Sequence, residues 1–435
     1  MTMDSAMPDQ ASMTPTVLSS SMRWRIVLYL GILVLLLSFG APLGGLIQIP
    51  ISFLIKNKLH LTAHEAAEFK LLAAVPLYLS FIFGFIRDTW SPFRKGDRGF
   101  IMLFGGISAG LYIYFAFIPI GYVTLLVALT LLTSSFLFVS SAQSGLTSAI
   151  AQQHLMSGQI STAWNIFESL PRIVALLAGG SLSDLLEART VDEAARILFL
   201  IGAAIMVSVA VYGAWKPRSV FDNLRAERGT VPRPLDDLRR LVGHWPIYPA
   251  LLIWFLWNFA PGSSTPLQYF LQNMLHAKDA QWGQWNAIFA ISFTPTFILF
   301  GLLCHRFPLK TLLLWGTIVA VPQMVPLVFV HSVTGAFIAA ALMGLMGGVA
   351  TAAYVDLIIR SCPRALQGTT LMMAASLSAI ALQFGDVLGT NLYDYYGGFA
   401  VCVIAVTVVY ALIIPALFLV PKRLIATADG EGSGS

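Results

Sequence analysis

Four side chains with the types and spacing to do chemistry stand close together in one apolar segment: Trp164, Asn165, Glu168 and Arg172. Glu168 and Arg172 are four residues apart, so on an α-helix they share one face, with Trp164 and Asn165 one turn earlier. Together they would present an aromatic ring, an amide, a carboxylate and a guanidinium. If the segment crosses a bilayer, its ionisable groups are costly there and mark a functional site.

Three interpretations of the Glu168–Arg172 pair follow from its chemistry. Glu168 takes up and releases a coupling proton, or Arg172 binds an anionic substrate, or the two form an ion pair that fixes their helix to a neighbour. With a helix start near Gly158, Glu168 would lie about 15 Å deep at ~1.5 Å per residue. This depth is roughly the midplane of a bilayer, where a substrate between two halves of a protein would be bound.

The composition requires a membrane around these residues. Of the 435 residues, 57% are hydrophobic and 11% are charged, whereas a soluble domain carries about 25% charged residues. Twelve segments are long and apolar enough to span the hydrocarbon core, which takes about 20 residues. They lie near residues 25–53, 67–87, 99–119, 122–146, 159–183, 195–215, 248–272, 284–304, 311–330, 335–358, 368–390 and 398–420.

The basic residues support this count and give an orientation. With a cytoplasmic N-terminus, 19 of the 26 Lys and Arg residues fall in cytoplasmic loops, six fall outside, and Arg172 is left within a span. This asymmetry is the positive-inside pattern, and it predicts a multi-pass protein of the cell (inner) membrane with both termini cytoplasmic. Because the basic residues stand at helix ends, the net charge of +5 gives no reason to expect a nucleic-acid partner.

Two further spans carry candidate binding residues. In the seventh span, Asn258 and Gln268 flank a segment with two prolines, and such broken helices are tolerated where they line a cavity or pack on protein. Asp386 lies toward the outer side of the eleventh span. Asp356 is four residues from Arg360, so these two side chains are expected to pair.

The two halves of the chain repeat one another weakly. The pairs occur in chain order and in equivalent spans, at offsets of 219, 217 and 210 residues: Pro42 with Pro261, Gly84 with Gly301, and Gly158 with Gly368. This order predicts two parallel six-span repeats. We expect a disordered cytoplasmic N-terminus (1–22), an N-terminal half (23–215), a cytoplasmic central loop (216–245), a C-terminal half (246–421) and a flexible C-terminal tail (422–435).

The loop between the second and third spans resembles a known signature. Gly84 and Asp88, followed by Arg94 and Arg98, resemble the signature of that loop in the major facilitator superfamily. The resemblance implies an all-α membrane protein with twelve transmembrane helices in two six-helix pseudo-repeats, the major facilitator fold. It also implies a conformational gate, in which Asp88 pairs with basic loop residues in one state and releases them in another.

A narrower resemblance covers more of the chain. The stretch from Pro50 to Leu61, Pro76 eight residues before Gly84, the stretch 261–275, and Cys362-Pro363 resemble the folate–biopterin transporter family. This resemblance implies the same fold and raises pterins or folates as a substrate class. Where that family usually has a lysine and a proline, this chain has Ser80 and Phe81, so the resemblance implies the fold more directly than the substrate.

The sequence predicts no enzyme and no cofactor. It has no phosphate-binding loop, no dinucleotide fingerprint and no His/Cys metal pattern, and its three cysteines imply no disulfide framework. We therefore predict a monomeric secondary active transporter of a small organic solute, anionic or pterin-like, that works by alternating access with protons as the coupling ion. The alternative is a non-transporting assembly factor or sensor on the same fold.

Overall fold

The computed structural model describes residues 19–59, 63–187, 189–215, 217, 239, 241–277, 279–363 and 366–429. These residues form helices and no strand. Nine helical segments in this part of the chain are long and apolar enough to cross a membrane. The other three of the twelve expected spans are the second, the fifth and the seventh. The second and the seventh are divided into shorter helices, and the fifth carries Glu168 and Arg172. The prediction of an all-α membrane protein with twelve spans in two halves is confirmed.

The N-terminal half begins earlier than expected, because Ser19 caps the first helix at the amide of Met22. Residues 1–18 of the segment predicted to be disordered lie outside the described residues. The elements of this half are α1 (Ser20–Gly40), α2 (Gln48–Phe53), η1 (Leu54–Lys58), α3 (Ala63–Ala73), α4 (Val75–Tyr78), α5 (Ser80–Thr89), η2 (Pro92–Arg94), α6 (Asp97–Ala116), α7 (Tyr122–Gln153), α8 (Ser157–Glu187) and α9 (Val191–Ala214).

The C-terminal half begins after the predicted central loop, most of which is outside the described residues. Its elements are α12 (Ile247–Asn258), α13 (Thr265–Tyr269), η3 (Phe270–Met274), α14 (Asp279–Leu303), α15 (Leu309–Ala320), η4 (Val325–Phe329), α16 (Val333–Ser361), α17 (Gln367–Tyr395), α18 (Phe399–Ala411), α19 (Ile413–Leu417) and α20 (Lys422–Ile425).

Proline and glycine break the first and seventh spans at matching places. α1 ends at Gly40, ahead of Pro42, and helix resumes at Gln48. α12 ends at Asn258, ahead of Pro261, and α13 restarts with Pro266 in its first turn. Proline lacks the N–H that would continue a helix, but it fits well at a helix start. Both spans are therefore pairs of shorter helices joined by a non-helical break.

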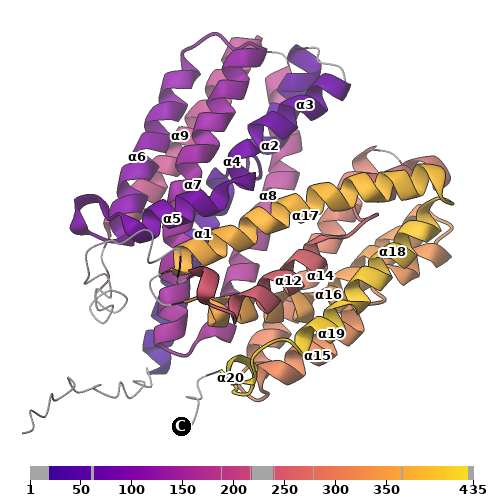
Figure 1. Cartoon of the computed structure of the whole chain (residues 1–435). Coiled ribbons are helices and arrows are strands. Elements are labelled where there is room, and N and C mark those ends of the chain that lie inside the picture. The colour runs from indigo at the N-terminus through magenta and orange to yellow at the C-terminus, as the bar shows by residue number, and fades with distance from the viewer. Residues whose placement is uncertain are drawn as a thin grey trace, which may run out of the picture.

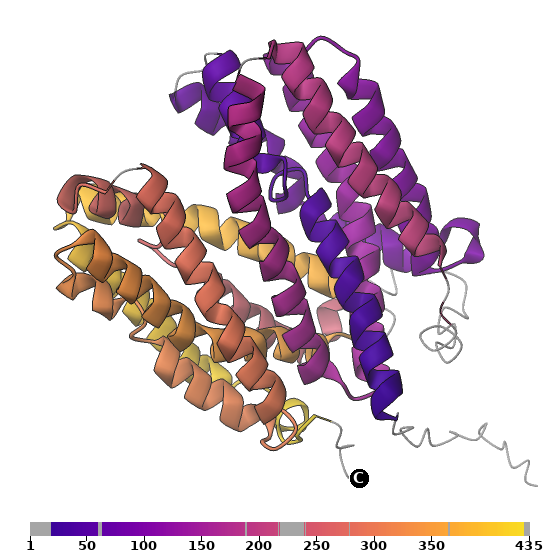
Figure 2. The same ribbon diagram turned by 180° about the vertical axis from the view of Figure 1, so that it is seen from behind.

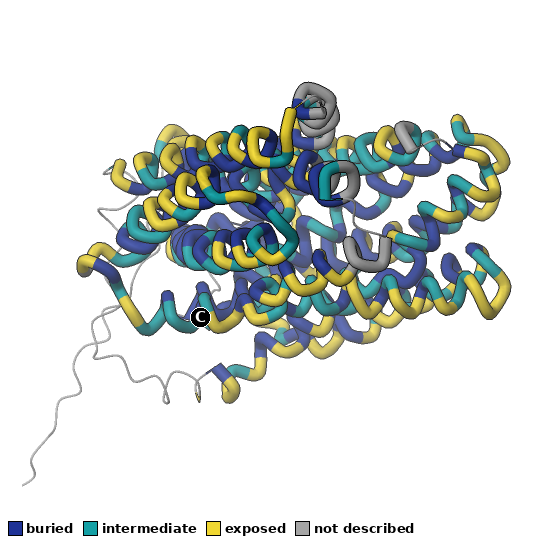
Figure 3. The backbone as a smooth tube through the Cα atoms, turned by 90° about the horizontal axis from the view of Figure 1, so that it is seen from above, coloured by how far each residue is buried: buried dark blue, intermediate teal, exposed yellow. Residues whose placement is uncertain are grey.

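Each half has its own apolar core. One cluster of buried side chains draws on α1, α2, α6, α7 and α9, and a second draws on α12 to α19. Exposed residues lie mainly on the outer faces of both halves (Figure 3), as expected of helices that face lipid. Because lipid is as apolar as these faces, close packing within each half provides most of the attraction between helices.

The two halves meet at one end and diverge toward the other (Figures 1 and 2). We call the end where α1 begins and where the described chain stops, at Asp429, the terminal side, and the opposite end the far side. The helices that join the halves are α17 against α5 and α7, and α8 against α14 and α16. A small apolar cluster near the terminal side, including Ile26, Ile150 and Ile359, also draws on both halves.

Candidate functional site

The helix α8 carries the residues that the sequence singled out, and one of its faces points at the C-terminal half. Ser161 Oγ donates a hydrogen bond of 2.7 Å to the main-chain oxygen of Ala352 in α16. Trp164, nearly one turn later, packs against the core of the C-terminal half. Glu168 and Arg172 follow Ser161 by seven and eleven residues, so they continue the same face toward the far side.

Glu168 and Arg172 are both exposed, because on the far side the C-terminal half has turned away from α8 (Figure 2). Glu168 Oε2 accepts a hydrogen bond of 2.9 Å from Trp164 Nε1. No ion pair joins Glu168 to Arg172 within the described part of the chain. The interpretation of a fixed ion pair is therefore not what the structure shows, since neither exposed side chain is held against the other.

Asn165 lies deeper than its neighbours. Its side chain is 9% exposed, and its Nδ2 donates to the main-chain oxygen of Ser161 at 2.7 Å. The amide is therefore satisfied by its own helix in this conformation. A ligand that reached Asn165 would have to compete with that bond.

The C-terminal half has an uncharged counterpart to Glu168. Ser378 of α17 stands 210 residues after Glu168, at the repeat offset, and its Oγ donates to Asn258 Oδ1 at 2.7 Å. Asn258 Nδ2 in turn donates to Trp254 O at 2.8 Å. The predicted residue Asn258 is thus bonded to Ser378 of α17. Ser378 is the position in the second repeat that corresponds to Glu168 of α8.

Asp386 and Gln268 lie beside the break in the seventh span. The two carboxylate oxygens of Asp386 accept from the amide of Thr265 at 2.8 Å and from its hydroxyl at 2.7 Å. Asp386 therefore caps the start of α13 and ties it to α17, a structural contact that the sequence did not predict. Gln268 is half-buried within α13, one turn beyond this cap.

The predicted gate has a different set of partners from those expected. Asp88 Oδ2 accepts from the amide and hydroxyl of Thr369, both at 2.6 Å, while Oδ1 accepts from Arg87. Arg98 donates to the main-chain oxygen of Gly213 at 3.2 Å, at the end of α9, and the side chain of Arg94 is outside the described residues. Asp88 thus joins the N-terminal half to the first turn of α17.

Gly84 is required at this junction. A Cβ at Gly84 would stand 2.6 Å from the main-chain oxygen of Gly368, so a larger residue would push α5 and α17 apart. Sequence reasoning missed Arg87, which is 3% exposed and forms ion pairs with Asp88 and Asp97. Arg87 compensates the negative charges of Asp88 and Asp97. Asp97 lies ten residues away across a turn, and no local sequence pattern indicates that contact.

The C-terminal tail is also different from the prediction. Residues 422–429 are not a free end: α20 forms, and Ile425, Ala428 and Asp429 are buried. The expected Asp356–Arg360 pair is confirmed, with Arg360 Nε 2.9 Å from Asp356 Oδ1. The tail packs beside this pair because Arg360 also donates a hydrogen bond to the main-chain oxygen of Thr427 in the tail.

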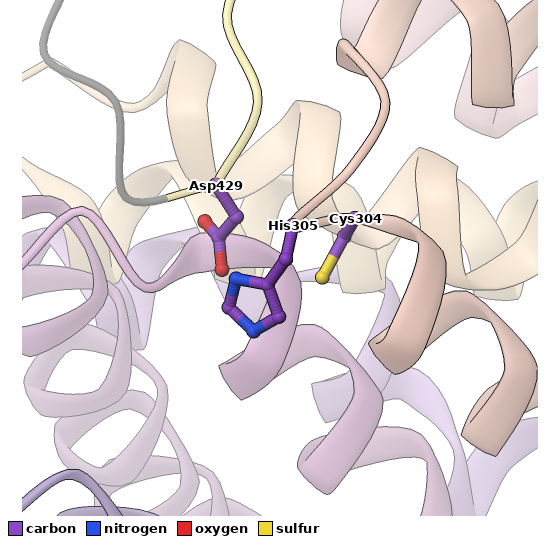
Figure 4. A group of neighbouring side chains, drawn as sticks. All are labelled: Cys304, His305 and Asp429. Carbon is purple, nitrogen blue, oxygen red and sulfur yellow. The ribbon is translucent and has the colours of Figure 1, made fainter. Parts of the chain in front are cut away.

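Three possible metal-ligating side chains meet at this tail: Cys304, His305 and Asp429 (Figure 4), with ligand atoms within 4.8 Å of one another. Both oxygens of Asp429 already accept main-chain amides, of Gly158 and Gln159, each at 3.1 Å. The group therefore has the chemistry of a packed polar contact between halves.

Together, the twelve helical spans, the two halves joined at one end and the charged face of α8 define a multi-pass membrane protein with the architecture of a secondary transporter. A family model, Major Facilitator Superfamily, matches residues 157–390, which is more than half of the chain. The chain belongs to the major facilitator superfamily. It is accordingly a transporter in class, and not an enzyme. The narrower resemblance to folate–biopterin transporters stays a prediction.

Solved structures agree with this fold. The chain is similar to the human organic anion transporter MFSD10 (TETRAN), with a TM-score of 0.66 and 16% identity over 92% of this chain and 100% of that one. It is similar to FucP in the outward conformation, with a TM-score of 0.66 and 16% identity over 91% and 98% of the two chains. The proton:xylose symporter XylE, bound to 6-bromo-6-deoxy-D-glucose, matches with a TM-score of 0.66 and 13% identity over 95% and 99%. No curated protein matches the sequence.

Proposed function

We propose that this protein is a secondary active transporter that moves a small organic anion across the membrane by alternating access. The observation that carries the proposal is the face of α8. On the terminal side this face is bonded to the C-terminal half through Ser161, and further along it presents Glu168 and Arg172, both exposed, where the halves have parted. Within the described residues no ion pair joins this carboxylate or this guanidinium to another charge. Ionisable groups at that depth are typical of a binding or coupling site.

The direction of the opening follows from the charge asymmetry. If the terminal side is cytoplasmic, as the 19 basic residues assigned to it predict, the conformation is open to the outside and closed to the cytoplasm. The closed end is held by bonds between halves, including Ser80 Oγ to Met372 O at 2.8 Å and Gln152 Nε2 to Cys362 O at 2.9 Å. Closing the far side and breaking these bonds would complete the cycle.

Arg172 supports an anionic substrate. A guanidinium presents planar donors that match a carboxylate or phosphate, and Arg172 is exposed on the far side of Glu168, so an anion entering from there would meet it first. Glu168 would then carry the coupling proton, because a protonated carboxyl near the bound anion removes a repulsive charge. Folates belong to this class because they carry carboxylates, and the planar ring that they share with pterins could also contact Trp164.

The test is substrate-dependent flux in proteoliposomes. Purified protein would first be screened by thermal shift against pterins, folates, nucleosides, peptides and organic acids, and hits would then be tested for uptake with and without a pH gradient. Saturable uptake of an anion that is driven by the gradient is the expected result. Thermal stabilisation without flux for any compound of the panel would instead favour a sensor or assembly factor on this fold.

A further inference from the structure

The C-terminal tail is fastened to the C-terminal half through its main chain. Asp429 N donates to Cys304 O at 2.9 Å, and Arg360 Nη1 donates to Thr427 O at 3.0 Å. Ala428 and Asp429 are 7% and 6% exposed, so both are buried. The tail thus lies in a defined place beside the end of α14 and the end of α16.

From this place the carboxylate of Asp429 reaches the N-terminal half. Its Oδ1 accepts from Gly158 N at 3.1 Å and from Ser157 Oγ at 3.4 Å, and its Oδ2 accepts from Gln159 N at 3.1 Å. These are the first three residues of α8, so the carboxylate satisfies N–H groups that a helix start leaves without partners. A residue held by one half therefore caps a helix of the other.

The same arrangement occurs a second time with the halves exchanged. Asp88 of the N-terminal half caps α17 at the amide of Thr369, the third residue of that helix, and Gln159 is the third residue of α8. Thr369 follows Gln159 by 210 residues, the offset of the repeat. Asp88 and Asp429 therefore form two related contacts, one on each side of the interface between halves.

The two contacts differ in where the carboxylate comes from. At the repeat offset of 217 residues, the counterpart of Asp88 after α14 is His305, which has no carboxylate to offer. The side chain of His305 lies beside Asp429 (Figure 4) and contacts Gln159. The tail thus supplies the carboxylate that caps α8, because the loop after α14 has no carboxylate at the corresponding position.

Gly158 makes room for this contact. A Cβ at that position would stand 2.8 Å from Cys304 Cβ and 3.4 Å from Asp429 Cγ. The start of α8 therefore lies close to the end of α14, with the tail packed over both. Cys304, 1% exposed, is covered by this junction and can report on it.

We propose that Asp429 is a latch: together with Asp88, it holds the two halves closed on the terminal side and must release the start of α8 for the transporter to open there. The tail is then a working part of the transport cycle. This inference rests on the alternating access of the proposed function, but the contact itself does not depend on the substrate.

The first test is the rate at which Cys304 reacts with a maleimide, measured by mass spectrometry on the full-length protein. Loss of the carboxylate in Asp429→Ala removes a helix cap, and the reaction of Cys304 should accelerate roughly fivefold. Asp394→Ala, which removes an exposed carboxylate at the far end of α17, is the matched control and should leave the rate unchanged. Cys402, buried within α18, is the internal reference.

Asp88→Ala distinguishes a latch from a local cover over Cys304. Asp88 belongs to the other contact, so its loss should also accelerate the reaction of Cys304 if both contacts hold one interface. An unchanged rate in Asp429→Ala would overturn the proposal. So would an equal increase at Cys402, because that would indicate general loosening of the protein.

The second test measures the opening itself. Spin labels at Gly121, on the far side between α6 and α7, and at His331, between η4 and α16, report the separation of the halves there. Asp429→Ala should increase the population with a shorter distance, and an identical distance distribution in the variant and the wild type would refute the latch. Neither test uses a substrate, so failure to detect transport would leave this result interpretable.

Discussion

The carboxylate of Asp88 accepts two hydrogen bonds from Thr369, one from the main-chain amide and one from the hydroxyl, both at 2.6 Å. These two residues come from different halves, and they meet where the protein is closed. The bonds therefore stabilise this conformation relative to one in which the terminal side is open. A cap of this kind contributes about 1 kcal/mol, enough to shift an equilibrium roughly fivefold.

Asp88→Ala should accordingly shift the protein toward the state that is open on the terminal side. Thr369→Val is the graded control, since it removes the hydroxyl but keeps the amide bond, and it should have a smaller effect in the same direction. The distance between labels at Gly121 and His331 measures both variants. Equal effects of the two substitutions would show that the amide contact contributes nothing.

Glu168→Gln should abolish uptake driven by a pH gradient and leave exchange of substrate across the membrane intact. The amide keeps the size of the side chain and can still accept from Trp164 Nε1, but it cannot take up or release a proton. Trp164→Phe, which removes this donor and keeps an aromatic ring, should retain gradient-driven uptake. Concentrative uptake at the wild-type rate in Glu168→Gln would remove the coupling role from this residue.

Arg172→Ala should raise the half-saturation constant for an anionic substrate tenfold or more, because a hydrogen bond to a charged group contributes about 1.5–3 kcal/mol. Arg172→Lys should recover part of the loss, since it restores the charge without the planar donors. Arg306→Ala, an exposed arginine outside the spans, serves as the control. A half-saturation constant unaffected by Arg172→Ala would place the anion elsewhere.

The latch should strengthen at acidic pH. Burial raises the pKa of Asp429 to about 6, with a further increase from Asp356 and an opposing effect of Arg360 and the α8 amides, whereas a released carboxyl titrates near 4. The latched state therefore binds the proton more tightly, and it gains stability as the pH falls through about 6 toward 4.

The population with widely separated labels at Gly121 and His331 should therefore rise between pH 7 and pH 5 in the wild type. Asp429→Asn cannot titrate and should show a flat profile. His305, which also faces Asp429, is tested by His305→Gln, where the dependence should persist. Loss of the profile in His305→Gln alone would assign it to the imidazole.

Much of the architecture could be predicted from the sequence because it depends on local properties. A membrane span is recognised from about 20 apolar residues in a row. The lysines and arginines beside it indicate its orientation in the membrane, and prolines such as Pro42 and Pro261 indicate where its helix is broken. The unusual pair Glu168 and Arg172 was visible for the same reason: a charge within an apolar segment is conspicuous without any knowledge of its neighbours.

The partners of those charges were decided by tertiary structure alone. Glu168 and Arg172 share a helix face as predicted, but the parting of the halves leaves both side chains exposed. Asp429 seemed to be part of a flexible end, yet it accepts a hydrogen bond from the amide of Gly158, 271 residues earlier, in the first turn of α8. A carboxylate's role depends on which N–H groups lie within about 3 Å of it, and only the packing of one half against the other sets those distances.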